Sequence, residues 1–302
     1  MKFPLCGPTY FGDSTSLGDR CINFIPEVNP DNAKGQVTLR GTPGTSLWVT
    51  CPVGNLRGMY VFGSFLWVVS NNQIYQYTAG KARTSIGSLT TTTGHISFAD
   101  NGYTADGGNE IVLSDGATLR VINSDTRVMT TISNPTALYG LEFIDGYIVG
   151  CKTNSMRARC SDIYDALTWN ALATATIASS QDRVMSCVNN REQLWFIKEY
   201  SSEVWYNAGV ATSQGFPFQR ISGMVYNFGT INPYAVASGN GNIYFPARQK
   251  TTGDWNEIAG IMEISGAGAK IVTPPSINKY LSELTFTSSI YGPFAYCMNI
   301  AG

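Results

Sequence analysis

The residues best suited to chemistry or binding lie in the segment from position 201 to 220. It carries four aromatic side chains close to one cation: Trp205, Tyr206, Phe216, Phe218 and Arg220. Aromatic rings beside an arginine can stack nucleic-acid bases, cradle a sugar, or pack within an ordinary β-sheet. These alternatives describe three classes of protein: a nucleic-acid binder, a carbohydrate-active protein and a structural part.

Catalytic constellations are hard to build from the rest of the chain. The sequence has one histidine, His95, and no G-x-S-x-G stretch accompanies it. Hydrolysis by a Ser-His-Asp triad would therefore have to pass through a lone histidine at a predicted strand start. We expect no catalytic residues, and the protein is predicted not to be an enzyme.

Metal and cofactor sites are not expected either. The seven cysteines are scattered and never spaced as C-x-x-C, which is typical of free and mostly buried thiols in a reducing compartment. Asp100, Asp106 and Glu110 lie among glycines, but their spacing fails the EF-hand pattern and is better explained by a solvated hairpin. The glycine-rich stretches at 41–46 and 265–270 fit no phosphate or dinucleotide fingerprint.

The segment from Ser161 to Trp169 is similar to the Asp-box turn of some sialidase propellers. Ser161, Asp165, Thr168 and Trp169 match its residue types, but the spacing is off by one and the glycine is missing. In such a turn the carboxylate caps turn amides and the tryptophan packs between strands. Hydrolysis would also need a positioned pair of carboxylates. A carbohydrate-binding or glycosidase-like β-propeller, acting in receptor binding, stays the alternative function.

Charge gives no drive toward nucleic acid or acidic membranes. Charged residues make up 14% of the 302 residues and the net charge is −1. The closest approaches to basic patches, Arg157–Arg159 and Ala247–Lys250, are interpreted as isolated surface cations. The sequence has neither a signal peptide nor an apolar run long enough to span a membrane. We expect a soluble protein made in a cytoplasm.

The elements that must position these residues are short strands that repeat. Five units of alternating apolar strands and tight turns such as Asp145-Gly146 recur every 40 to 45 residues, the period of a four-stranded propeller blade. Helical patterns are confined to 161–175, which a loop with one helical turn also explains, and 274–284. The predicted fold class is an all-β propeller with an extended N-terminal arm.

The predicted organisation is an arm at 1–45 and a propeller of five to six blades at 46–302. A sixth blade begins near Thr285, and the strand-like run at its end does not complete it. An open sheet edge exposes unpaired backbone groups. Either the arm supplies the missing strands or the chain belongs to a longer protein, and we favour the longer protein.

The opening segment fits this architecture as a hairpin of one blade. The strand "EVWYN" is the return strand of "QLWFI", and we expect Trp195 and Trp205 to lie near each other across the pair. "FPF" follows as a rigid connector, since proline cannot continue a central strand. The aromatic residues are therefore interpreted as blade packing rather than as a stacking platform.

The same stretches resemble the podovirus tail hub family, also called packaged-DNA stabilisation proteins. The resemblance covers about residues 20 to 285, includes Arg57-Gly58 in the first unit, and is most specific in the middle of the chain. The residues that carry it there are Thr168, Trp169, Asp182, Arg183, Trp195, Glu203, Trp205, Tyr206, Phe216, Pro217 and Phe218.

The resemblance implies a structural role in the virion tail. Members form a ring, expected to be a hexamer, below the portal and adaptor proteins; they line the DNA channel and retain the packaged DNA. They also carry a tail fibre, spike or needle, and they contact genomic DNA without sequence specificity. Assembly in the bacterial cytoplasm and no membrane span are implied as well. Low charge suits a channel in which DNA must slide, because each phosphate contact adds affinity and friction.

Overall fold

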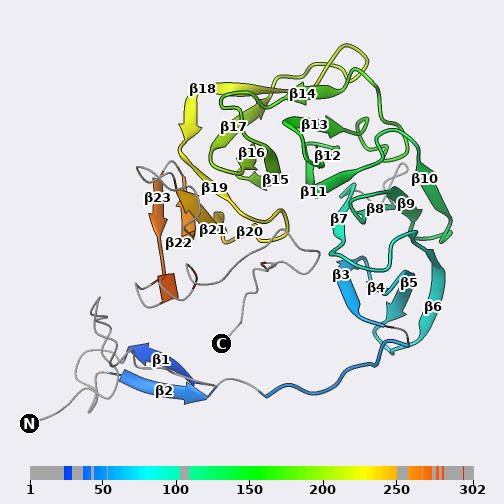
Figure 1. Ribbon diagram of the computed structural model, residues 1–302. Helices are drawn as coiled ribbons and strands as arrows, with labels where there is room; N and C mark the ends of the chain where they lie inside the picture. The colour runs from blue at the N-terminus through cyan, green and yellow to red at the C-terminus, as the bar shows by residue number, and fades with distance from the viewer. Residues whose placement is uncertain are drawn as a thin grey trace, which may run out of the picture.

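The computed structural model is built almost entirely of β-strands, arranged as an open arc of sheets (Figure 1). It describes residues 24–28, 37–41, 44–52, 54–102, 109–249, 258–266, 268–273, 277–278, 281 and 295. Within these ranges five sheets of at least four strands follow one another along the chain. The all-β propeller predicted from the sequence is confirmed.

The first three blades are four-stranded antiparallel meanders in which consecutive strands pair. Blade 1 contains β3 (Leu56–Phe62), β4 (Phe65–Ser70), β5 (Gln73–Thr78) and β6 (Arg83–Ser88). Blade 2 contains β7 (Ser97–Asp100), β8 (Glu110–Ser114), β9 (Leu119–Asn123) and β10 (Met129–Ile132). Blade 3 contains β11 (Leu138–Ile144), β12 (Tyr147–Lys152), β13 (Arg157–Cys160) and β14 (Thr174–Thr176).

The fourth blade repeats this meander, whereas the fifth departs from it. Blade 4 contains β15 (Val184–Asn190), β16 (Gln193–Lys198), β17 (Ser202–Asn207) and β18 (Phe218–Tyr226). Blade 5 contains β19 (Phe228–Thr230), β20 (Ala237–Gly239), β21 (Asn242–Gln249), β22 (Ile258–Ser265) and β23 (Gly268–Ile271). In this blade the short strands β19 and β20 both pair with β21. The first strands of successive blades lie on the inside of the arc (Figure 1) and recur every 41 to 46 residues, as expected.

Tight turns join the strands where the sequence predicts them. Asp145 and Gly146 have φ of 50° and 86°, and Asn240 and Gly241 have φ of 54° and 73°. Two successive positive φ angles define the turn that best matches the twist of a β-hairpin, and Asp-Gly and Asn-Gly adopt it at low cost. These dipeptides therefore fix the registers of β11 with β12 and of β20 with β21.

The hydrophobic core is divided into layers between consecutive blades. Four clusters of buried side chains fill the contacts between blades 1 and 2, 2 and 3, 3 and 4, and 4 and 5. Each strand sends alternate residues to the layers on its two faces. Cys151, Cys160 and Cys187 are free thiols buried in the layer between blades 3 and 4, in agreement with the expected free and buried cysteines.

The remaining predictions of local structure have mixed outcomes. The segment 161–175 forms turns and the start of β14 and no helix. Of the predicted helix at 274–284, Ile277, Asn278 and Leu281 are helical and the rest lies outside the described residues, as does the predicted start of a sixth blade. In the arm, β1 (Phe24–Val28) and β2 (Val37–Gly41) form an antiparallel hairpin with each other.

Candidate functional site

The two tryptophans of the central hairpin lie on opposite faces of blade 4. β16 and β17 pair as predicted, but Trp195 is opposite Val204, and Trp205 is opposite Leu194. Trp195 packs in the layer toward blade 5, whereas Trp205 packs in the layer toward blade 3. The expectation that they lie near each other across the pair is wrong, because their side chains differ by one residue in register and a sheet alternates faces at every residue.

The aromatic residues after the hairpin form one buried cluster around Trp205. Its ring lies 5.6 Å from Phe196 and 6.1 Å from Phe216 in edge-to-face geometry, and Phe216 lies 5.7 Å from Phe218. Pro217 is also buried and directly precedes β18, as expected of a connector. The cluster is blade packing, since its rings are turned inward and cannot receive a base or a sugar.

Tyr206 differs from its aromatic neighbours because it faces outward. Its side chain is 44% exposed, and its hydroxyl group donates to Gln219 Oε1 at 3.4 Å. A single exposed ring, paired across to the outer strand β18, does not make the multi-ring stacking platform that nucleic-acid recognition uses.

A buried ionic network occupies the other end of this hairpin. Lys198, at the end of β16, is fully buried and its Nζ lies 2.8 Å from Asp182 Oδ1 and 3.5 Å from Glu203 Oε1. The same Nζ donates to the carbonyl oxygen of Ser180 at 2.7 Å and to its hydroxyl at 3.0 Å. Two residues of the family-like stretch, Asp182 and Glu203, are thus joined by a lysine that the sequence analysis did not single out.

The carboxylates of this network are hydrogen-bonded on all sides. Asp182 Oδ2 accepts from the backbone amides of Tyr200 and Ser201 at 2.8 and 3.0 Å. Burial alone raises the pKa of Asp182, but the bonds from Lys198, Ser180 and the Tyr200 amide outweigh it and hold that pKa below its usual value. Asp182 therefore stays ionised beside Lys198.

Glu203 continues the network toward the aromatic cluster. Its Oε1 accepts from the Ser179 amide at 2.8 Å and from the Ser179 hydroxyl, and its Oε2 accepts from Trp205 Nε1 at 3.3 Å. The network therefore ties the 179–182 segment to β16 and β17. Its groups are satisfied by one another, which suits a structural fastening better than catalysis.

Arg183, next to Asp182 in sequence, takes no part in this network. Its guanidinium is half exposed and pairs with Glu199 at 3.0 Å on the surface. Glu199 also binds Arg248 at 3.1 Å and so links the turn between β16 and β17 to β21 of blade 5. The Asp182-Arg183 pair thus has one buried and one exposed member with separate partners.

The Asp-box-like segment forms the turn that the sequence analysis described. Asp165 Oδ1 accepts from the amides of Leu167 and Thr168 at 2.9 and 3.1 Å, and the Asp162 amide donates to Thr168 O at 2.8 Å. Trp169 is buried between blades 2 and 3, with its Nε1 donating to the carbonyl of Ala166 at 2.8 Å. Glu110 Oε2 accepts from the Ala166 amide and from Asn101, so this carboxylate is also committed to supporting the turn.

The first blade is fastened to the second by Arg57. Its guanidinium is buried and donates to the carbonyls of Asn71, Thr91, Thr93 and Gly94 at 2.5 to 2.9 Å. These carbonyls belong to the β4–β5 turn and to the linker that leads to blade 2. The family resemblance included the Arg57-Gly58 pair, but no local pattern in the sequence predicted that the arginine would be buried.

The centre of the arc is crossed by the loop between β19 and β20 (Figure 1). Tyr234 of this loop lies 5.2 Å from the ring of His95, which belongs to the linker between blades 1 and 2. Tyr234 also packs on the core layer between blades 3 and 4. His95 is therefore a contact between distant blades, as expected of a structural residue.

The described part of the chain offers no metal centre and no membrane-spanning helix. Within it, no three histidine, cysteine or carboxylate side chains gather closely enough to hold a metal ion. Asp106 of the glycine-rich loop lies outside the described residues. None of the helical residues described belongs to a helix long and apolar enough to cross a bilayer.

Comparison with known protein families decides the identity of this propeller. The family described as "Bacteriophage P22 Gp10, beta-propeller" matches residues 14–292, which is most of the chain. The protein belongs to this phage stabilisation family. The expected membership of the packaged-DNA stabilisation proteins is confirmed, and it identifies the chain as a structural protein of the phage virion.

Other comparisons of this stabilisation protein add only the fold. A catalytically inactive virginiamycin B lyase from Staphylococcus aureus, solved with quinupristin, has a TM-score of 0.50 and 12% identity, over 84% of this chain and 78% of the lyase. The Neurospora crassa Pan2 WD40 domain has a TM-score of 0.46 and 9% identity, over 72% and 65% of the two chains. No curated protein sequence matches the chain. Likeness in fold at such identity carries no activity across.

Proposed function

We propose that the protein is a subunit of the tail hub of a short-tailed phage. It forms a ring below the portal and adaptor proteins, lines the DNA channel, retains the packaged genome and carries a fibre, spike or needle. The observation that carries the proposal is the family match over residues 14–292, on a chain whose described residues form five propeller blades and whose buried polar groups serve blade packing. No enzymatic step is required of such a part.

The DNA channel of the proposed hub runs between subunits rather than through one propeller. This is supported by the loop carrying Tyr234, which crosses the middle of the arc and contacts His95 and the core between blades 3 and 4. A net charge of −1 fits a wall along which DNA slides without deep electrostatic wells. Contacts with genomic DNA are then independent of sequence.

Assembly of the ring rests on the organisation proposed for the chain, with an arm at 1–45 and a propeller at 46–302. A ring needs a heterologous interface that closes on itself. The β1–β2 hairpin pairs only with itself among the described strands of the sheets, so it is available to reach a neighbouring subunit. The hexameric state and assembly in the bacterial cytoplasm follow from the family resemblance.

The proposal is tested by reconstitution with the portal and adaptor of the same phage. Purified protein is mixed with a portal–adaptor complex, and the product is separated by sedimentation and imaged by negative-stain electron microscopy. We expect a ring added below the adaptor, and its loss in a chain lacking residues 1–45. Failure of the full-length chain to join the complex would count against the hub.

A further inference from the structure

One end of blade 3 carries two cations side by side on its surface. Cys151 of β12 pairs with Ala158 of β13, and the same register places Lys152 opposite Arg157. Both cations are exposed, and neither forms an ion pair with a carboxylate among the described residues. Like charges that face each other across two strands destabilise a sheet. Their placement is explained if an anion outside the chain lies over them.

Further cations continue from this pair toward blades 4 and 5. The Arg183 guanidinium donates to the side chain of Asn154 at 3.2 Å, and Asn154 lies in the turn between β12 and β13. Arg183 also pairs with Glu199, which binds Arg248 of blade 5 at 3.1 Å. A line of contacts therefore joins the two cations of blade 3 to the arginines of the next two blades.

These four cations form what we call the cationic rim: Lys152, Arg157, Arg183 and Arg248. The neighbouring Asp182 is buried against Lys198, so the charges of that pair cancel. The rim is therefore positive, although the chain as a whole has a net charge of −1. Because the fold gathers the rim from three blades, the sequence shows no basic run at these positions.

The other end of blade 3 is acidic. Asp145 lies in the turn between β11 and β12, and the Tyr164 amide donates to the Gly146 carbonyl of that turn at 2.7 Å. The segment that carries Asp162 and Asp165 therefore lies at the same end. Blade 3 has its exposed carboxylates at one end and the cations of the rim at the other. A polyanion is attracted to the rim and repelled from the opposite end.

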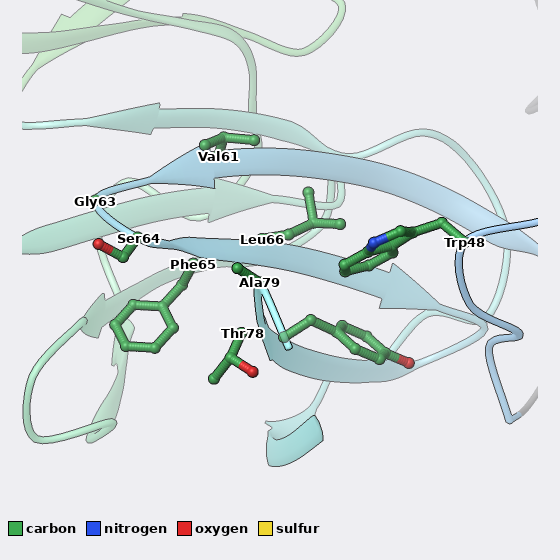
Figure 2. Close-up of a pocket in the computed structure, with 9 residues that line it drawn as sticks. Trp48, Val61, Gly63, Ser64, Phe65, Leu66, Thr78 and Ala79 are labelled. Carbon is green, nitrogen blue, oxygen red and sulfur yellow. The ribbon is translucent and has the colours of Figure 1, made fainter. Parts of the chain in front are cut away.

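Two cations of blade 1, Lys81 and Arg83, are exposed as well but lie over aromatic rings. Lys81 Nζ is 6.0 Å from the centre of the Trp48 ring, and the Arg83 guanidinium is 5.3 Å from that of Tyr75. Figure 2 shows Trp48 alongside Leu66 at an apolar hollow of about 330 Å³. This lysine and arginine thus border apolar surface, and they make a matched control for the exposed lysine and arginine of blade 3.

We propose that the cationic rim binds the phosphate backbone of duplex DNA. Arginine and lysine side chains donate to phosphate oxygens without reading the bases, so the contact is independent of sequence. Each neutralised phosphate adds about 0.9 to the slope of log affinity against log salt, so four cations give weak binding that salt readily reverses. The isolated subunit is sufficient for this binding. That the DNA it meets is the genome in the tail channel rests on the proposed hub.

The salt dependence of DNA binding tests this directly. The full chain is titrated into a labelled short duplex of mixed sequence at several salt concentrations, and binding is followed by fluorescence anisotropy. We expect the double variant Lys152→Gln/Arg157→Gln to lower the salt slope by about two and to bind at least about tenfold more weakly at low salt. The control Lys81→Gln/Arg83→Gln should leave the slope unchanged. Equal losses in the two double variants, or no binding by the native protein, overturn the proposal.

Glu199→Gln gives a result that a damaged fold cannot imitate. The Glu199 carboxylate competes with phosphate for Arg183 and Arg248, so removing its charge should tighten DNA binding at low salt at least about threefold. Unchanged or weaker binding overturns the proposal.

Vesicles that contain an anionic phospholipid are the second probe. Vesicle binding that depends on the rim, without DNA binding, assigns the rim to a membrane surface and overturns the proposal. These assays use the isolated subunit, so their failure is distinct from failure of the hub. A chain that joins the portal–adaptor complex but binds no DNA keeps the hub and loses the rim, and DNA binding without assembly does the reverse.

Discussion

Lys198 Nζ lies 2.8 Å from Asp182 Oδ1 inside blade 4, and both side chains are almost completely shielded from water. Removing one member of a buried pair leaves the other charged and unpaired, which typically costs about 3–5 kcal/mol. Lys198→Met leaves Asp182 without its cation, and leaves Glu203 with only Arg220, whose guanidinium lies 3.9 Å away. We expect the free energy of unfolding to fall by about 3–5 kcal/mol in urea denaturation.

The matched control for this change is Arg183→Met on the same blade. Arg183 pairs with Glu199 on the surface and is 46% exposed, so its loss should cost about 1 kcal/mol or less. A Lys198→Met variant no less stable than Arg183→Met would show that the buried network does not hold the blade.

The lowered pKa of Asp182 also makes the free energy of unfolding depend on pH. Its pKa is lower in the folded protein than in the unfolded chain, where an aspartate titrates near about 3.9. Its contribution is therefore complete above that pH and is lost as pH falls through the lowered folded-state pKa. We expect the stability difference between the native protein and Asp182→Asn to be constant from pH 5 to 7, roughly, and to shrink below about pH 4. A difference that grows on acidification would contradict the assignment.

Arg57 is predicted to hold the linker between blades 1 and 2. Lysine cannot reproduce the planar fork that serves several carbonyls at once, so Arg57→Lys should leave some of them unpaired and cost about 2 kcal/mol. We expect faster amide hydrogen exchange at Leu89 and Ile96, which border the linker. Arg127→Lys, whose Nε donates to Gln76, is the control. Unchanged exchange in the linker would refute this role.

Trp195 and Trp205 should contribute to stability independently. They pack in different core layers, and side chains without shared partners usually add within about 0.5 kcal/mol. A double-mutant cycle of Trp195→Phe with Trp205→Phe should therefore show no coupling beyond that value. Trp205→Phe with Phe216→Leu, whose rings touch, serves as the coupled reference. Strong coupling between the two tryptophans would contradict the observed register.

The periodicity of the sequence was enough to predict the blades because each blade repeats the same local pattern of short strands and tight turns. Alternating apolar residues specify strands, and Asp145-Gly146 or Asn240-Gly241 specify hairpin turns from their own backbone preferences. The register of a hairpin depends on the number of residues in its turn. An error of one residue in that number places a side chain on the opposite face of the sheet. That is why β16 and β17 were paired correctly while Trp195 and Trp205 were placed together wrongly.

The buried polar groups were harder to foresee. Lys198 follows the apolar run Leu194–Ile197, and a lysine at that point can equally end a strand in solvent. Its burial depends on Asp182 and Glu203, which reach it only after the blade has formed. Arg57 depends in the same way on carbonyls of a linker more than 30 residues away. Contacts of this kind follow from the tertiary fold and have no local pattern.

The central claim, a place in the phage tail hub, is tested most directly by electron cryomicroscopy of the intact virion that contains this protein. The account predicts density for a ring immediately below the adaptor, into which the five described blades of residues 56–271 fit. Finding the protein in the capsid or at the tip of a fibre, or finding none of it in the tail tube, would contradict the claim.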